Sequence, residues 1–288
     1  MFTIKAPAKV NWFLEVKGKR PDGYHELETV MQAVSLFDEI SVEDRADGEL
    51  ILTCNIDLGA PEKNLVYRAA ELMRQHHAPG RGAQIALNKQ IPHGAGLGGG
   101  SSDAANALIA LNRLWDLHLH KNVLQDIVAR VGSDCAFFVE GGTAVCTGRG
   151  EIVEQLPDIG VFHLVLLYPN DVCPTPQVYG ELSRDLTYSP RNCYLFLPAK
   201  MDAPQLASGV FNRLQESALK VSAKLRAAWE STAHEPGVLV RFVSGSGSSV
   251  AFLLNDEAAA QQLEDSLTAR SLGRAYAVKT LPGGAVWG

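Results

Sequence analysis

The chain has 288 residues, of which 46% are apolar and 20% are charged, and its formal net charge is −6. These values are typical of a globular protein with one large domain or two ordinary ones, and they exclude collagen-like and low-complexity chains. An acidic chain without a cluster of Lys and Arg argues against nucleic acid as a partner.

The N-terminal residues lack the apolar core of a signal peptide, and no later apolar run is long enough to span a membrane. The cysteines are odd in number and widely spaced, which argues against a disulfide framework and a zinc site. We therefore expect a soluble, cytoplasmic protein with no membrane partner. The five cysteines are Cys54, Cys135, Cys146, Cys173 and Cys193.

In the first half of the chain, apolar residues alternate with Asn11 and Glu15, a period of two that predicts a strand. Asn64 is a plausible N-cap for an amphipathic helix that follows it. The predicted strands span residues 9–16, 40–42, 50–52 and 85–87, with a loop at 17–24 and a turn at 46–48. The predicted helices span residues 65–76, 101–116 and 123–131, followed by a hairpin at 141–150.

We place a domain boundary after residue 157, which separates an N-terminal domain (1–157) from a C-terminal domain (158–288). Beyond the boundary we predict strands at residues 162–168, 238–243 and 250–254, and helices at 206–219 and 257–270. Helices and strands are mixed without a regular βαβ repeat, which favours an α+β fold over a doubly wound sheet.

The most informative segment is IPHGAGLGGGSSDAA, residues 91–105. Glycines dominate residues 94–102, and backbone N–H groups without a nearby Cβ can turn inward and approach an anion. The helix predicted to begin at Ser101 adds its N-terminal dipole and free N–H groups. A strand, a glycine loop and a helix N-terminus in this order predict a phosphate site, whereas a flexible linker would not lead into an amphipathic helix.

Two better-known phosphate motifs fit this segment less well. A P-loop requires Lys after its last glycine, and here Gly99 is followed by Gly100. The dinucleotide pattern GxGxxG matches Gly94, Gly96 and Gly99, but that fold needs a second strand ending in an acidic residue about 20 positions later. That region is predicted to be helix, so a dinucleotide-binding domain is disfavoured.

Three segments together resemble the motifs of the GHMP kinases, which include galactokinase, homoserine kinase and mevalonate kinase. The glycine run resembles the central motif of this family, APAKVNWFL (residues 6–14) resembles its N-terminal motif, and SGSGSSVAF (residues 244–252) resembles its C-terminal motif. The resemblance extends over nearly the whole chain. It implies a two-domain α+β fold, with an N-terminal domain like ribosomal protein S5 domain 2 and a ferredoxin-like C-terminal domain.

A fourth segment, RPDGYHEL (residues 20–27), is similar to a signature of one branch of this family, and Pro174-Thr-Pro, Asn64-Leu and VGSDC (residues 131–135) also match that branch. The branch phosphorylates a cytidine diphosphate-linked methylerythritol at its 2-hydroxyl, with ATP as donor. The resemblance therefore implies an ATP-dependent small-molecule kinase of isoprenoid precursor synthesis. The alternatives are another GHMP kinase, acting on homoserine or mevalonate, and a non-catalytic nucleotide-binding module.

The resemblance implies catalytic roles for Asp134 and Lys9. A carboxylate can orient an attacking hydroxyl and accept its proton, and a nearby ammonium group would keep that carboxylate ionised. By itself Asp134 could equally be a turn or N-cap residue after Gly132, and Lys9 a solvated residue at a strand start. Only the family resemblance brings the two residues together.

The acceptor site is also inferred from the resemblance. Tyr24 and Tyr179 correspond to aromatic residues that enclose the pyrimidine, and His25 corresponds to a residue that hydrogen-bonds its edge. Asn11 corresponds to a substrate contact, and Met31 stands where the family often has Phe. Gly245 and Ser246 of the third motif complete the predicted acceptor site.

For ATP, the resemblance implies contacts from the glycine run and from two separate residues, Asn64 and Lys89. The predicted residues of the run are Pro92, His93, Gly94, Ala95, Gly96, Leu97, Gly98, Gly99, Gly100, Ser101 and Ser102. Mg²⁺ is implied because the β- and γ-phosphates need their charge neutralised during transfer. No residue of the sequence can be assigned as a direct metal ligand, although a hydroxyl of the run could contact the ion through water. The chain is expected to be a monomer or a homodimer.

Overall fold

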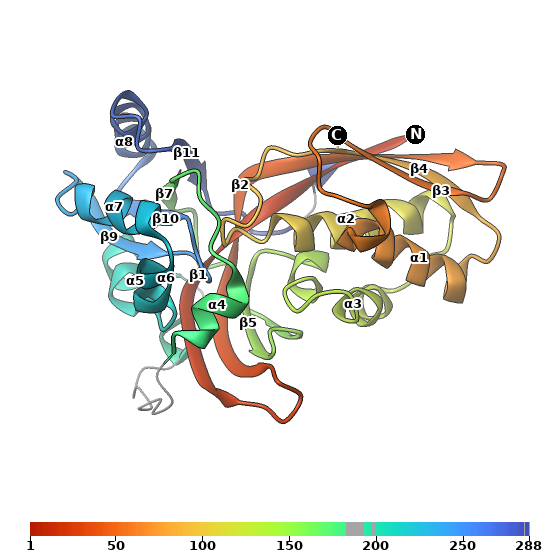
Figure 1. The fold of residues 1–288 in the computed structure, drawn as a ribbon, viewed down its shortest axis with the longest axis horizontal. Coiled ribbons are helices and arrows are strands. Elements are labelled where there is room, and N and C mark those ends of the chain that lie inside the picture. The colour runs from red at the N-terminus through yellow and green to blue at the C-terminus, as the bar shows by residue number, and fades with distance from the viewer. Residues whose placement is uncertain (183–192, 197–199, 285, 288) are drawn as a thin grey trace.

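Two long antiparallel strands, β1 (Phe2–Lys19) and β2 (His25–Arg45), run through both halves of the molecule (Figure 1). The computed structural model describes residues 1–182, 193–196, 200–284 and 286–287. Both strands are much longer than predicted, because their residues are buried along most of their length on both faces. The register shifts between Asn11 and Phe13, and such an irregularity re-aims the neighbouring side chains.

In the described part of the chain, eight strands form the larger sheet, in the order β12–β1–β2–β4–β3, with β5 beside β2, β6 beside β5 and β8 beside β1. The turn predicted at residues 46–48 is present, but the strands on its two sides do not pair with each other. The third strand instead lies parallel to β4, which separates it from β2, and a helix joins these two parallel strands. The remaining strands of this sheet are β3 (Leu50–Cys54), β4 (Gly82–Asn88), β5 (Thr143–Gly148), β6 (Ile152–Gln155), β8 (Phe211–Asn212) and β12 (Val286–Trp287).

Three helices, α1 (Leu65–His77), α2 (Gly99–Leu114) and α3 (Lys121–Ala129), lie together against the larger sheet (Figure 1). All three helices are confirmed within two residues of the predicted bounds. Asn64 caps α1, since its side chain accepts a hydrogen bond from the backbone N–H of Val66 at 2.9 Å. The second helix begins two residues earlier than predicted, on the last two glycines of the run.

The smaller sheet has the order β11–β7–β10–β9. Its strands are β7 (His163–Tyr168), β9 (Val238–Val243), β10 (Val250–Leu254) and β11 (Arg274–Lys279), and the three predicted strands are confirmed. Successive residues of β7 face opposite sides, as the pleat requires. Leu164 and Leu166 pack in the same core as Trp12 of β1, whereas Val165 and Leu167 pack beneath helices on the other side. The smaller sheet thus rests directly on the long β1–β2 pair.

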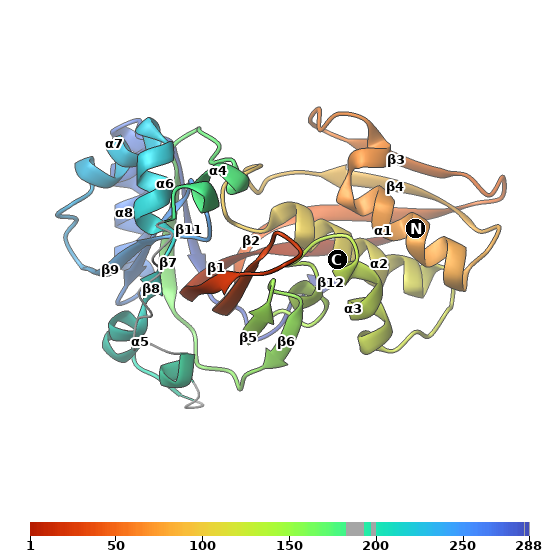
Figure 2. The ribbon, with the colours of Figure 1, turned by 60° about the horizontal axis from the view of Figure 1, so that its bottom comes forward.

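Three helices, α6 (Gln215–Val221), α7 (Ala223–Ser231) and α8 (Glu257–Ala269), lie on one side of the smaller sheet (Figure 2). The helix predicted at residues 206–219 is wrong. It is divided into α5 (Ala203–Gly209) and α6, with β8 between them. The periodicity is overridden by tertiary contacts: the Asn212 side chain donates to two backbone carbonyls, and Arg213 forms an ion pair with Glu15 at 2.7 Å.

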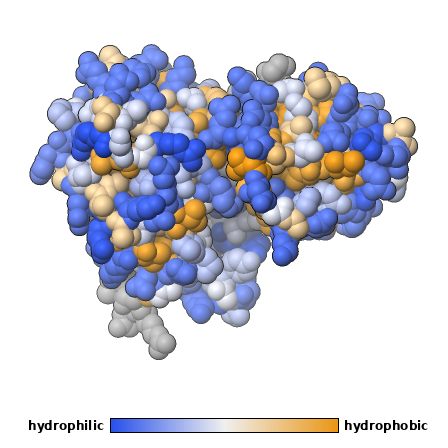
Figure 3. All heavy atoms as spheres, turned by 45° about the horizontal axis from the view of Figure 1, so that its top comes forward, coloured by the Kyte–Doolittle hydropathy of each residue, from blue (hydrophilic) through white to orange (hydrophobic). Residues whose placement is uncertain are grey.

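The loop-rich stretch of the second half contains the short helix α4 (Thr175–Gly180), which lies beside the β1–β2 pair (Figure 1). The helices and strands confirm the α+β prediction. The boundary after residue 157 stays a prediction, and two strands that follow it, β8 and β12, pair with β1. No helix among the described residues is both long and apolar enough to cross a bilayer. The surface in Figure 3 is mostly polar, with apolar atoms near the junction of its two lobes.

Candidate functional site

A cavity of about 1580 Å³ opens between the glycine run, the β1–β2 pair and α4. Its walls come from segments far apart in the sequence, and most of the predicted site residues line it. Those residues are Lys9, Asn11, Tyr24, His25, Met31, Lys89, Pro92, His93, Gly94, Ala95, Gly96, Leu97, Gly98, Gly99, Gly100, Ser101, Asp134, Tyr179, Gly245 and Ser246. Asn64 and Ser102 do not line it.

The glycine run forms an open backbone cradle at one end of the cavity. Gly94, Gly96 and Gly98 all have φ between 67° and 76°, a conformation that other residues rarely adopt. Gly98 is the N-cap of α2 and has no side chain to occupy the free N–H groups of the first turn. These groups and the helix dipole therefore face the cavity, an arrangement that favours an anion.

The second glycine loop, residues 244–249, packs directly on the first. The backbone N–H of Ser249 donates to the carbonyl of Ala95 at 3.0 Å, and the Ser244 hydroxyl donates to the carbonyl of Gly96 at 3.0 Å. A Cβ on Gly96 would overlap the Ser244 carbonyl oxygen, so this approach requires glycine. The two loops are therefore built as one unit, although the sequence separates them widely.

Lys9 and Asp134 both line the cavity and lie next to each other. Their Nζ and Oδ2 atoms are 3.7 Å apart, and Lys9 Nζ donates to Asn11 Oδ1 at 2.6 Å. Lys9 and Asn11 are two positions apart on β1, so the pleat points both side chains to the same face. The backbone N–H of Lys9 donates to the Leu97 carbonyl at 2.9 Å, which joins the strand to the cradle.

The electrostatics of this pair follow from its burial. Lys9 is 3% exposed, and burial lowers the pKa of its ammonium group, an effect that the neighbouring Asp134 carboxylate opposes. The Asp134 side chain is about one third exposed (32%), so it can reach a ligand in the cavity. Asn11 is held by Thr29, whose hydroxyl accepts from Asn11 Nδ2 at 2.8 Å. A partly exposed carboxylate beside a buried cation can orient a hydroxyl group and accept its proton.

Aromatic side chains from β2, from the loop before it and from α4 line one part of the cavity, which we call its aromatic end. The rings of His25 and Tyr179 stack with centroids 4.8 Å apart and an interplanar angle of 27°. Burial and the nearby charge of Lys19 lower the pKa of His25, so its ring favours the neutral form. Tyr24 is half exposed, and the Arg149 guanidinium lies 4.8 Å from its ring centroid. This end offers flat apolar faces and a neutral imidazole, which suit a planar base.

Met31 is fully buried and contributes apolar surface to the cavity. Two residues predicted to contact the nucleotide have other surroundings. Asn64 lines a separate cavity of about 400 Å³ next to residues 52–61, and its side chain caps α1. Ser102 is buried in α2, where Asn106 Nδ2 donates to its hydroxyl at 3.3 Å. Its hydroxyl therefore belongs to the packing of the helix, not to the cavity wall.

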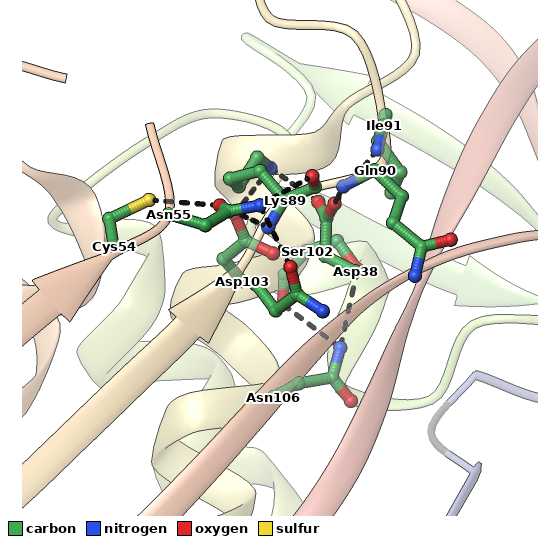
Figure 4. Close-up of polar contacts among 10 residues, drawn as sticks. Asp38, Cys54, Asn55, Lys89, Gln90, Ile91, Ser102, Asp103 and Asn106 are labelled. Carbon is green, nitrogen blue, oxygen red and sulfur yellow. Dashed lines mark hydrogen bonds and ion pairs between the residues drawn. The ribbon is translucent and has the colours of Figure 1, made fainter. Parts of the chain in front are cut away.

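Lys89 lines the cavity, but its ammonium group is held by two buried carboxylates, those of Asp38 and Asp103 (Figure 4). Three residues at the site were not predicted from the sequence. Thr29 and Arg149 line the cavity, and Asn212 donates to the backbone carbonyl of Gly245 in the second glycine loop. Arg149 stands between two glycines, which gave a weak signal of a loop near the site. For the other residues nothing in the local sequence distinguishes a contact to the site from ordinary packing.

Comparisons with known proteins agree with these features. Residues 64–142 match the family model described as the GHMP kinases N terminal domain, and residues 199–271 match GHMP kinases C terminal. The chain is 38% identical over 271 residues to the 4-diphosphocytidyl-2-C-methyl-D-erythritol kinase of Syntrophomonas wolfei, covering 93% of this chain and 94% of the relative. It is 38% identical over 288 residues to the enzyme of that name from Mycobacterium tuberculosis, covering 97% and 90%.

Solved structures are similar over almost the whole chain. A crystal structure of 4-(cytidine 5'-diphospho)-2C-methyl-D-erythritol kinase has a TM-score of 0.76 and 32% identity, and the match covers 98% of this chain and 99% of the other. A homoserine kinase from Cytophaga hutchinsonii also has a TM-score of 0.76, with 17% identity and coverage of 99% and 96%. At that identity the second match shows only that the fold is shared.

Proposed function

The chain belongs to the GHMP kinase family, among the 4-diphosphocytidyl-2-C-methyl-D-erythritol kinases, and from this we propose that it transfers the γ-phosphoryl group of ATP to the 2-hydroxyl of 4-diphosphocytidyl-2-C-methyl-D-erythritol. The reaction belongs to the non-mevalonate route to isoprenoid precursors. The observation that carries the proposal is that the Lys9–Asp134 pair lines the same cavity as a phosphate cradle and a group of aromatic side chains.

We assign the proton transfer to Asp134. Its carboxylate accepts the proton of the acceptor hydroxyl as that oxygen forms a bond to the γ-phosphorus, while the bond from the γ-phosphorus to the bridging oxygen of ADP breaks. Lys9 keeps its positive charge next to the carboxylate and offsets the negative charge that gathers at the reacting oxygens. Asn11 and Thr29 hold Lys9 in the rotamer that faces Asp134.

We assign ATP to the cradle. The free N–H groups of residues 94–101 and the dipole of α2 face the phosphates, and they supply positive potential without a charged side chain. Closely packed glycines hold this backbone in place before a ligand arrives, which lowers the cost of reorganisation during transfer. Asn64 stays a candidate for the adenosine end, through the smaller cavity that it lines.

We assign the cytidine to the aromatic end of the cavity. Tyr179 and Tyr24 supply ring faces for stacking, and a neutral His25 can donate or accept a hydrogen bond at the edge of the pyrimidine. Met31 contributes apolar surface to the wall of the same cavity. Gly245 and Ser246 line the cavity close to Lys9, where the polyol part of the acceptor would lie.

Mg²⁺ is the expected companion of ATP. No cluster of three His, Cys, Asp or Glu side chains able to hold a metal occurs among the described residues. This agrees with Mg²⁺ chemistry, because the ion keeps several waters and binds mainly through substrate phosphates. Ser101 lines the cavity and its hydroxyl can reach a hydrated ion through water. When bound, the ion would neutralise charge on the β- and γ-phosphates.

The widely spaced cysteines, which form no disulfide framework, support a cytoplasmic location for this reaction. A coupled assay of ADP release tests the proposal. Purified protein receives Mg-ATP together with the cytidyl substrate, homoserine or mevalonate. We expect ADP formation with the cytidyl compound alone. Turnover of homoserine or mevalonate instead would assign the chain to another acceptor, and no turnover with any of them would favour a binding module.

A further inference from the structure

A buried cluster of one ammonium group and two carboxylates lies behind the glycine run (Figure 4). Lys89 follows β4, Asp38 comes from β2 and Asp103 comes from the second turn of α2. The Lys89 Nζ atom contacts a carboxylate oxygen of Asp38 and lies 2.6 Å from Asp103 Oδ2. None of the three side chains is more than 3% exposed. The cluster therefore joins three elements at the point where the chain enters the cradle.

Asp38 makes contacts that Asp103 does not. Its Oδ1 atom accepts hydrogen bonds from the backbone N–H groups of Gln90, at 2.5 Å, and Ile91, at 2.8 Å. These residues immediately precede Pro92, the first residue of the cradle. Hydrogen bonds from N–H groups to a buried carboxylate are stronger than neutral ones. Asp38 therefore fixes the direction in which the backbone leaves β4 and enters the glycine run.

The same carboxylate positions Lys89. A Cβ on Gly99 would lie 3.0 Å from Lys89 Nζ and 3.0 Å from a methyl group of Ile91, so the ammonium group lies against the first residue of α2. Held there by two carboxylates, Lys89 supports the start of the helix from behind. Its position is thus set by the cluster, and the cradle itself presents backbone N–H groups to the cavity.

Asp103 provides an internal comparison. Its Oδ1 atom is buried without a hydrogen-bond partner, whereas both oxygens of Asp38 are engaged. Burial raises the pKa of Asp103, which favours its protonated form, and the Lys89 ammonium group opposes this shift. An amide at position 103 would resemble the protonated acid in shape and charge. The two carboxylates of the cluster therefore have unequal roles.

We propose that Asp38 is a positioning residue for the nucleotide: by holding Gln90, Ile91 and Lys89, it keeps the glycine run in the conformation that binds phosphate. The inference rests on the proposed function, in that the cradle is taken to receive the phosphates of ATP. Asp38 acts from behind the cradle, so it affects nucleotide affinity while leaving the aromatic end of the cavity unchanged.

Calorimetric titration with ADP and, separately, with CDP tests this role in the full-length protein, together with KM for ATP and kcat. In Asp38→Ala we expect ADP to bind at least about tenfold more weakly, with KM for ATP raised by a similar factor. The affinity for CDP should stay within about twofold, and kcat should fall less than KM rises. Asp38→Asn keeps an oxygen that can accept the two N–H groups, so it should restore part of the ADP affinity.

Two variants serve as controls. Asp103→Asn makes the same chemical change in the same cluster, and we expect ADP affinity within about twofold of the parent. Asp44 lies on the same strand as Asp38, but its side chain is half exposed and pairs with Arg81. Asp44→Asn should therefore leave the affinities for ADP and CDP unchanged. If Asp38→Ala does not fold, the ADP titration of Asp38→Asn tests the proposal, and we expect its ADP affinity to be lower by about threefold or more.

Unchanged ADP affinity in the Asp38 variants, or an equal loss of ADP and CDP affinity, would overturn the proposal, since the latter outcome indicates general disruption. The proposal would also be overturned if Asp103→Asn lost as much ADP affinity as Asp38→Asn. The test is separate from that of the acceptor. A protein that binds ADP but phosphorylates no cytidyl compound contradicts the proposed function, while the ADP titrations still decide the role of Asp38.

Discussion

Lys9 Nζ lies 3.7 Å from Asp134 Oδ2, although the two residues are far apart in the sequence. Lys9 belongs to β1, and Asp134 belongs to the turn before the short 3-10 helix at Ala136–Val139. The Lys9 side chain is buried, whereas the Asp134 carboxylate is partly exposed and can reach a ligand in the cavity. This arrangement places a carboxylate and a buried ammonium group next to the glycine run.

Asp134 is expected to be required for turnover but not for nucleotide binding. In Asp134→Asn the amide can still accept a hydrogen bond but cannot take the proton, so kcat should fall by a factor of about 10² to 10⁴. The affinity for ADP, measured by calorimetry, should stay within about threefold, because the cradle is built from backbone groups. Near-normal kcat in this variant would remove Asp134 from the mechanism.

Lys9 is expected to matter more for activity than for stability. Burial lowers its pKa, so the folded state disfavours the charge, but Lys9→Met also leaves the buried Asn11 Oδ1 without its donor, and the unfolding temperature should stay close to that of the parent. The same change should lower kcat by about 100-fold or more, because the positive charge beside Asp134 is lost. Lys5→Met, at an exposed position on the same strand, is the matched control and should change neither quantity. A Lys9→Met protein with normal kcat would contradict the assigned role.

Tyr179 is expected to bind the acceptor through its ring. Tyr179→Ala removes the face that stacks with His25 and should raise KM for the cytidyl substrate by about tenfold, a typical loss for one stacking contact. Tyr179→Phe keeps the ring and should behave like the parent. KM for ATP should be the same in both variants. Equal changes in the two KM values would indicate a collapse of the cavity in place of a lost stacking contact.

Two glycines of the run should respond oppositely to the same substitution. Gly96→Ala introduces a Cβ that overlaps the Ser244 carbonyl, at a positive φ of 76°, and should lower the free energy of unfolding by about 3 kcal/mol or more. A Cβ on Gly100 would meet nothing closer than Leu65 Cδ1 at 3.8 Å. Gly100→Ala, in a helix, should raise that free energy by about 0.5–1 kcal/mol.

Urea denaturation with intrinsic fluorescence gives both values. A Gly96→Ala protein as stable as the parent would contradict the close packing of the two glycine loops. A destabilised Gly100→Ala protein would show instead that the first turn of α2 has no room for a methyl group. The pair of variants separates these two cases because the chemical change is identical.

Asp103 should make stability depend on pH. Burial, partly offset by Lys89, raises its folded pKa to about 8, far above the ordinary value for Asp. The folded state therefore holds a proton that the unfolded state releases, and this stabilising contribution is lost as the pH rises from about 4 through about 8. Asp103→Asn lacks the titration, so its stability relative to the parent should increase with pH in this window, by at most about 1.4 kcal/mol per unit. Parallel stability curves for the two proteins would exclude a protonated Asp103.

Local sequence was sufficient for elements whose signals are local. Asn64 before an amphipathic run predicted the start of α1, and alternation around Asn11 predicted part of β1, because capping and the pleat act over a few residues. The full length of β1 and β2 could not be predicted in this way. It depends on burial of both faces by the smaller sheet and by the helices, which no local pattern records. The same is true of Asn212, whose contacts divide the helix predicted at residues 206–219.

For the site, local sequence was sufficient to predict the glycine cradle, since glycines followed by a helix N-terminus leave backbone N–H groups free wherever they occur. With its family motifs it also indicated the chemistry and most of the residues that line the cavity. Which residues lie behind the glycine run depends on the tertiary fold and could not be predicted from local sequence. Asp38, Asp103 and Lys89 come from three elements, and their charges are compatible with burial only because the fold brings them within hydrogen-bonding distance of one another.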